Sequence, residues 1–132
     1  MTNNKKNEQK FLTELINDER NSALFYAHLS TLAQKTTIRA ALEDIAVECG
    51  MNVNMLLVYC RSIGISPDEN FGNIEKNISL SDGLEWAVEV EKESMGKLRS
   101  KNGIKPYKAV YDSKKKRLPK LENCVEILVF NL

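Results

Sequence analysis

Apolar residues recur every three or four positions over most of this 132-residue chain, which is the spacing of one face of a helix. The pattern predicts three long helices, at about residues 8–34, 39–63 and 81–98. Thr36 or Thr37 is expected to cap the second helix, Gly64 to end it, and Ser81 to cap the third.

The tail repeats apolar residues at helical spacing, at Leu118, Leu121, Val125, Leu128 and Leu132. This pattern predicts a fourth helix. Pro119 and the strand-favouring run "VEILVFNL" oppose a regular helix, so the fourth helix is expected to be short or irregular. A basic connection is expected before it, over residues 99–117.

Helices with one apolar face each bury those faces most simply in an antiparallel four-helix bundle. The expected architecture is therefore all-α, as a single domain over residues 1–132 with a disordered tail at 1–7. The long connection between the second and third helices could cross one end of the bundle.

The composition is average for a soluble protein, and the formal net charge is only +1. The N-terminal "MTNNKKNEQK" lacks the apolar run of a signal peptide, and no stretch is apolar enough to span a membrane. Three cysteines without CxxC spacing are expected to be reduced thiols of a cytoplasmic protein.

Two glutamates lie on apolar helix faces. Glu19 is four residues after Leu15, and Glu91 is three after Val88, so both are expected to face the core. A buried carboxylate without a partner costs several kcal/mol. Either these two are hydrogen-bonded to Tyr26, Asn52 or each other, with one of them protonated, or they bind a metal ion.

The stretches "DERNSALFY" and "GLEWAVEVEKESMGKL" resemble the first and third helices of rubrerythrin-type proteins of the ferritin-like superfamily. The resemblance places Glu19 and Glu91 at ligand positions of a dinuclear metal site. It also implies a Glu-x-x-His pair on each of the other two helices.

Neither Glu-x-x-His pair is present. In "VECGMN", either Glu48 and Met51 or Cys49 and Asn52 take the two ligand positions, and the heptad pattern favours Cys49 and Asn52. The tail contains no such pair. The only histidine, His28, lies off the apolar stripe and is expected at the surface or rim.

The site is therefore expected to be degenerate, with no catalytic residue and no cofactor. The alternative is a residual metal site of Glu19, Glu91, Cys49 and perhaps Asn52, holding zinc, iron or manganese. Cys49 by itself is expected to be a small buried apolar side chain.

Charge is distributed unevenly along the chain. Residues 1–96 hold 9 basic and 15 acidic side chains, whereas 97–120 hold 10 basic and 1 acidic. The basic segment, densest at "KKKR", is expected to complement the acidic helices within the chain or across a dimer. An anionic partner is the other possibility, with nucleic acid disfavoured because no recognition motif accompanies the charge.

Together these patterns predict a non-catalytic scaffold or interaction protein that forms a homodimer. The first alternative is an active metalloprotein, an oxidase or peroxide-reducing protein using Glu19, Glu91 and Cys49. The second is a binding module that holds an anionic partner through residues 97–120.

Overall fold

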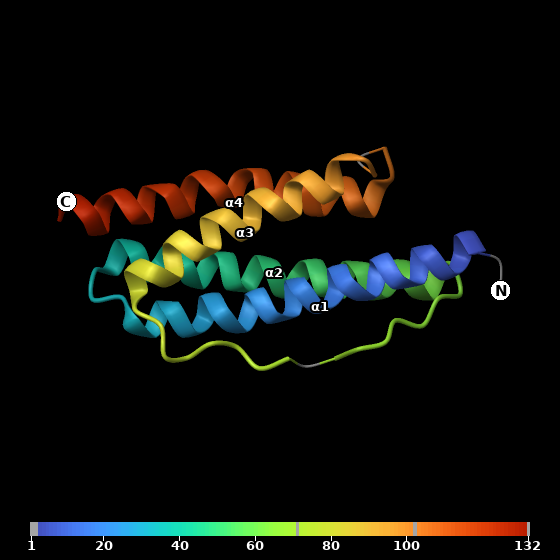
Figure 1. Ribbon diagram of the computed structural model, residues 1–132, viewed down its shortest axis with the longest axis horizontal. Coiled ribbons are helices and arrows are strands. Elements are labelled where there is room, and N and C mark those ends of the chain that lie inside the picture. Colours follow the sequence, from blue (N-terminus) through green and yellow to red (C-terminus); the bar gives the residue numbers. More distant parts are fainter. Residues whose placement is uncertain (1–2, 71, 102, 132) are drawn as a thin grey trace.

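The computed structural model describes residues 3–70, 72–101 and 103–131. These residues form four α-helices and no strand: α1 (Asn3–Leu32), α2 (Thr36–Ser62), α3 (Leu80–Arg99) and α4 (Lys105–Phe130). The predicted all-α class with four helices is confirmed. Figure 1 shows α1 and α4 running in one direction and α2 and α3 in the other. In the described part of the chain, every helix is too short or too polar to cross a membrane.

The helix ends follow local chemistry, although two predicted caps are wrong. Gly64 ends α2 as predicted. Its φ is +70°, and the amide of Ile65 donates to the carbonyl of Cys60 over 2.9 Å, as in a Schellman motif. Lys35, rather than a threonine, precedes α2 and makes no side-chain cap, while Ser79 rather than Ser81 caps α3.

The connection between α2 and α3 runs along the bundle beside α1 instead of crossing one end (Figure 1). Side chains of α1 hold its backbone. Gln9 donates to the carbonyl of Ser66, and Asn17 both donates to the carbonyl of Asp68 and accepts from the amide of Asn70. These bonds satisfy backbone groups that a segment without secondary structure cannot pair internally.

The prediction of a short or irregular fourth helix is wrong. α4 has 26 residues, begins at Lys105 in the segment expected to be a connection, and contains Pro119. Pro119 and Lys115, whose carbonyl loses its usual partner, are both on the exposed side, where water can replace the missing bond. Pro106 in the first turn suits helix initiation.

The buried face of α4 also differs from the predicted one. Leu118, Val125 and Leu128 are only partly buried, and Leu132 lies outside the described residues. Of the predicted positions that the structure describes, Leu121 alone is buried, and it belongs to a three-four spacing that also includes Tyr107, Val110, Lys114, Arg117 and Cys124. Two of these six side chains are cationic.

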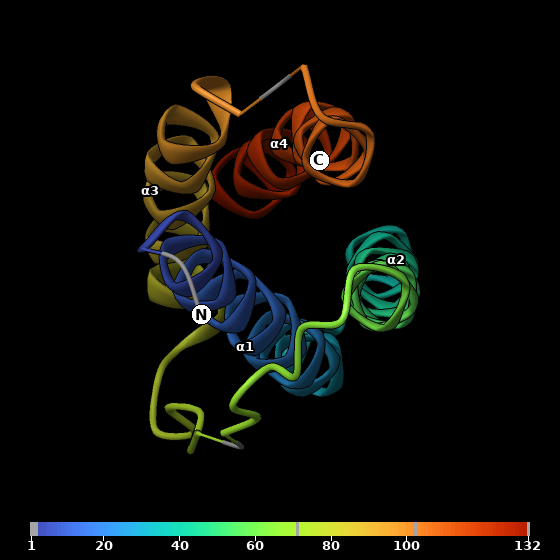
Figure 2. The same cartoon turned by 90° about the vertical axis from the view of Figure 1, so that its right-hand side faces the viewer.

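The core has two apolar clusters separated by a charged layer. One cluster contains Leu12 and Tyr107, and the other contains Leu29 and Leu121. Between them along α1 lies Glu19. In the end view of Figure 2 the four helices surround the long axis of the bundle. The prediction of a disordered tail at residues 1–7 is wrong for residues 3–7, which are helical. Residues 1–2 lie outside the described part.

A buried cluster of two carboxylates and two cations

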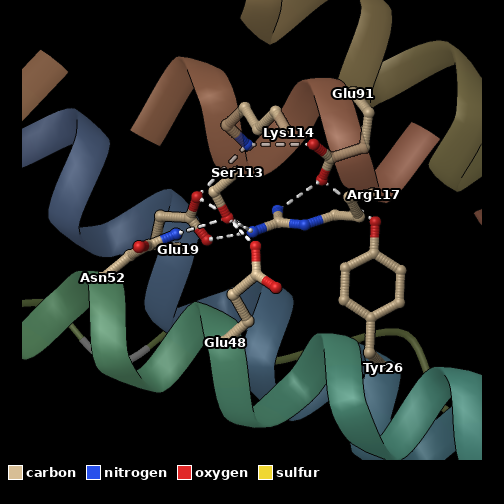
Figure 3. A network of polar contacts seen from close by, with 8 residues as sticks. All are labelled: Glu19, Tyr26, Glu48, Asn52, Glu91, Ser113, Lys114 and Arg117. Atoms are coloured by element: carbon tan, nitrogen blue, oxygen red, sulfur yellow. Dashed lines mark hydrogen bonds and ion pairs between the residues drawn. The ribbon is translucent and has the colours of Figure 1, made fainter. Parts of the chain in front are cut away.

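Four charged side chains meet at the centre of the bundle (Figure 3). Glu19 comes from α1, Glu91 from α3, and Lys114 and Arg117 from α4. No side chain of the four is more than 3% exposed. The two negative and two positive charges balance within this cluster, which is called the ion cluster below.

Each cation of the ion cluster bridges both carboxylates. Lys114 Nζ lies 3.4 Å from Glu19 Oε1 and 3.1 Å from Glu91 Oε2. Arg117 Nη2 lies 3.3 Å from Glu19 Oε2, and its Nη1 lies 3.0 Å from Glu91 Oε1. The four groups therefore form a closed ring, in which α4 joins α1 to α3.

The two cations determine how Glu91 ionises. Burial alone would raise the pKa of Glu91, but Lys114 and Arg117 outweigh burial and lower that pKa. Burial alone would lower the pKa of Arg117, whereas Glu19 and Glu91 raise it. The lowered pKa of Glu91 opposes the expectation that one of the two glutamates holds a proton, because that expectation did not include Lys114 and Arg117.

Polar neighbours from α1, α2 and α4 complete the surroundings of the ion cluster (Figure 3). The Tyr26 hydroxyl donates to Glu91 Oε1 over 3.0 Å, and Tyr26 is one of the alternative partners named from the sequence. Ser113 accepts from Asn52 at 3.1 Å and from Arg117 at 3.4 Å, and it donates to Glu48. α2 is therefore tied to α4 through hydrogen bonds rather than through a direct ion pair.

Cys49 lies beside the ion cluster as a neutral thiol. Its side chain is completely buried. Burial, followed by the nearby charge of Glu19, raises its pKa well above the usual range of a thiol. A protonated, buried thiol is a poor nucleophile and a poor metal ligand.

The structure brings the predicted site residues Glu19, Glu91, Cys49 and Asn52 to one place, but their surroundings do not fit a metal ion. Both carboxylates are engaged by cations, Cys49 carries its proton, and Asn52 is turned to Ser113. Among the described residues, no three His, Cys, Asp or Glu side chains are grouped so as to hold a metal. Positive side chains take the place where a metal ion would neutralise the carboxylates.

His28 lies away from this site. Its ring is partly buried at the surface of α1, and Nε2 lies 3.2 Å from the carbonyl of Lys76 in the connection. The predicted rim position therefore agrees with the structure.

Lys114 and Arg117 are the residues of the site that the sequence patterns did not single out. The "KKKR" segment was expected to complement acidic helices, and two of its four cations do so within the chain. Because residues 99–117 are predicted to be a connection, the sequence patterns do not predict the helical register that turns Lys114 and Arg117 inward. The signal was available in the three-four spacing that joins them to Tyr107, Val110 and Leu121.

The spacing of the central residues follows one rule on α2 and α4. Cys49 and Asn52 are three apart, and so are Lys114 and Arg117. Residues three apart on a helix lie on the same face, so each pair projects into the bundle together.

Comparisons with protein family models, curated proteins and solved structures found no match to this chain. The resemblance to rubrerythrin-type proteins therefore stays a prediction.

Proposed function

We propose that this chain is a non-catalytic, metal-independent bundle of ferritin-like, rubrerythrin type, acting as a scaffold or interaction protein. The carrying observation is the place of Lys114 and Arg117, between Glu19 and Glu91. In dinuclear carboxylate bundles, two helices each give one glutamate and two give Glu-x-x-His pairs. Here the glutamates remain, and Lys-x-x-Arg and Cys-x-x-Asn stand at the paired positions.

The order and direction of the helices support the proposed bundle type. Helices that pack side by side run antiparallel (Figure 1). α2 and α3 follow each other in the chain but run in the same direction, so one long crossover must connect the end of α2 to the start of α3. Residues 63–79 make that crossover. A single long crossover connection is the topology of ferritin-like bundles, whereas up-down-up-down bundles have short loops throughout.

Charge balance supports metal independence. A metal ion would have to displace Lys114 and Arg117 from both carboxylates and leave one buried ammonium group and one buried guanidinium group without partners. Leaving a buried charge unpaired costs about 3–5 kcal/mol. An oxidase or peroxide-reducing role through Glu19, Glu91 and Cys49 is disfavoured for the same reason.

Metal analysis of protein purified without chelators tests this proposal. Iron, manganese and zinc are expected at far below one equivalent per chain. A stoichiometric metal content that disappears in the Glu19→Ala, Glu91→Ala double variant would contradict metal independence and favour the metalloprotein alternative.

A gain-of-metal variant tests the proposed correspondence of positions. Cys49→Glu, Asn52→His, Lys114→Glu and Arg117→His together restore both Glu-x-x-His pairs. This variant is expected to bind about two cobalt(II) ions per chain, as a dinuclear site does. Cobalt absorption spectroscopy provides the readout, with the wild-type chain as the control. A folded variant that binds no cobalt would show that the helices do not have the ferritin-like register.

Exposed apolar side chains on α2 support the proposed scaffold role. Val47, Met51 and Val58 are 60–65% exposed, and their spacing places them on one helix face. Such a stripe is the usual kind of surface for helix-to-helix association, so the proposed homodimer would form here. The thiols Cys49, Cys60 and Cys124 are free and buried, which supports the proposed cytoplasmic setting.

Sedimentation equilibrium separates the dimer from the monomer. Val58→Asp is expected to weaken self-association strongly. Val129→Asp, at an equally exposed position on α4, serves as the matched control and is expected to have no such effect. A wild-type monomer at high concentration, or equal effects of the two variants, would argue against α2 as the interface.

The anionic-partner alternative loses two of its charges, since Lys114 and Arg117 are buried. The remaining exposed cations of residues 97–120 are tested by heparin retention. Retention that falls with salt and vanishes when the exposed Lys115 and Lys116 are replaced by glutamine would revive that alternative.

A further inference from the structure

A pocket of about 600 Å³ opens beside the ion cluster. Its walls come from α1, α3 and the connection between α2 and α3, and Lys114 of α4 reaches it from the core. The pocket forms because α1 packs mainly on α2, and α3 on α4, so α1 and α3 touch little. Residues 73–78 of the connection cover the gap from outside. The volume falls within the range of small-molecule sites.

Aromatic and aliphatic side chains form much of the pocket wall. Phe25 and Trp86 meet edge to face, with ring centroids 5.0 Å apart. Tyr26, Ile74 and Ile78 extend the apolar surface. Trp86 remains 54% exposed, which is unusual for the largest apolar side chain. The pocket therefore offers mainly the ring of Trp86 to a ligand, since Phe25 and Tyr26 are almost fully buried behind it.

The charges around the pocket are unbalanced. Four carboxylates line it, those of Asp18, Glu75, Glu91 and Glu93, against the ammonium groups of Lys97 and Lys114. Both ammonium groups have partners already. Lys97 lies 3.9 Å from Glu93, and Lys114 is held in the ion cluster. The surplus of negative charge thus lies with Asp18 and Glu75 at the exposed rim.

Asp18 is the carboxylate of the rim that most lacks a partner. In the described part of the chain it has no recorded hydrogen bond or ion pair, and Glu75 accepts only from the amide of Asn77. Desolvation raises the pKa of Asp18 despite the longer-range attraction of Lys114 and Lys97. A positive group placed next to Asp18 would reverse this effect.

We propose that the pocket binds a small organic cation, an ammonium group carried on an apolar or aromatic body. The ammonium would lie at Asp18 and Glu75, and the body would pack against Phe25 and Trp86. The carboxylates and the aromatic rings line the same pocket, so they act on the two ends of one ligand. The inference goes beyond the proposed function, because cation binding here needs neither the presence nor the absence of a metal.

Trp86 is the only tryptophan, so its fluorescence reports directly on the pocket. The probes are 4-phenylbutylamine, 4-phenylbutanol and 4-phenylbutyrate, which share a body and differ in charge. The amine is expected to shift the emission saturably, the alcohol to bind several-fold more weakly and the carboxylate to be weakest. Tighter binding of the alcohol or the carboxylate, or no saturable shift with the amine, would overturn the proposal.

Two variants test whether the carboxylate of Asp18, at the rim of the pocket, binds the ammonium group of the ligand. Asp18→Asn is expected to lower the affinity for the amine about two- to fivefold, the range of a partly exposed charge pair, and to leave the affinity for the alcohol unchanged. Asp44→Asn, the same change at an exposed position of α2 outside the pocket, is the matched control. Equal affinities in the two variants would remove Asp18 from the site. Metal content, measured separately, decides the proposed function independently of this result.

Discussion

Arg117 and Glu91 form a 3.0 Å ion pair at the centre of the protein, and neither side chain is more than 1% exposed. The pair joins α4 to α3 across the bundle, and Lys114 duplicates it on the other carboxylate oxygen. Ions buried in this way stabilise a fold only as a complete set, because each loses its hydration and depends on its partners.

Removing one cation of the ion cluster is expected to lower the stability of the protein more than removing an exposed cation nearby. Lys114→Met leaves Glu19 and Glu91 with one cation between them, so the free energy of unfolding should fall by about 3–5 kcal/mol. Lys116→Met makes the same change two residues along at an exposed position, and should alter it by no more than about 0.5 kcal/mol. Urea denaturation of both variants checks this difference. Similar losses in the two variants would contradict a structural role for the ion cluster.

Acid should weaken the protein partly through Glu91. Its folded pKa is lowered from the ordinary 4.5, so its contribution is complete above that value and is lost as pH falls below it through the folded pKa. Asp18 acts in the opposite direction because its pKa is raised. The informative quantity is therefore the difference between the wild type and Glu91→Gln, followed by denaturant unfolding from neutral to acidic pH.

Glu91→Gln is expected to lower stability at neutral pH and to flatten its fall below pH 4.5. Glu93→Gln, at an exposed position one face away on α3, is the control and should keep the wild-type pH profile. A Glu91→Gln profile parallel to that of the wild type would show that Glu91 is not held ionised by its cations.

Cys49 is expected to resist thiol reagents in the native protein. Its side chain is fully buried, and burial together with Glu19 keeps its pKa high, so the reactive thiolate is scarce. Labelling with a disulfide reagent, mapped by peptide mass spectrometry, should be slow in buffer and complete in urea. Rapid native labelling of Cys49 would show that the centre of the bundle opens readily.

Two glycines of α3 give opposite predictions for the same substitution. A Cβ at Gly83 would lie 2.6 Å from Leu29 Cδ2, a fully buried side chain of α1, whereas at Gly96 nothing lies within 4 Å. Gly96→Ala should therefore raise the free energy of unfolding by about 0.5–1 kcal/mol. Gly83→Ala should lower the free energy of unfolding, because the first turn of α3 could no longer pack closely on Leu29 of α1. Thermal denaturation of the pair provides the measurement, and equal stabilisation would refute this packing.

The sequence predicted most of the fold for a simple reason. Helix periodicity depends on neighbours three and four residues away, so α1, α2 and α3 follow from local patterns, as does the stop at Gly64. The sequence predicts too short a fourth helix because Pro119 is a strong local signal against a helix. In the structure Pro119 lies on the exposed face, where the lost hydrogen bond matters less than the packing of the other face.

The same division holds for the site. The sequence by itself determined that Glu19, Glu91, Cys49 and Asn52 face the core and that no histidine accompanies them. Only the tertiary structure decided what neutralises the carboxylates, since the register of α4 turns Lys114 and Arg117 inward. Lysine and arginine are usually exposed, and a run of four such residues gives no local sign of which are buried. Their burial is set by long-range pairing with carboxylates from α1 and α3, which are distant in the sequence.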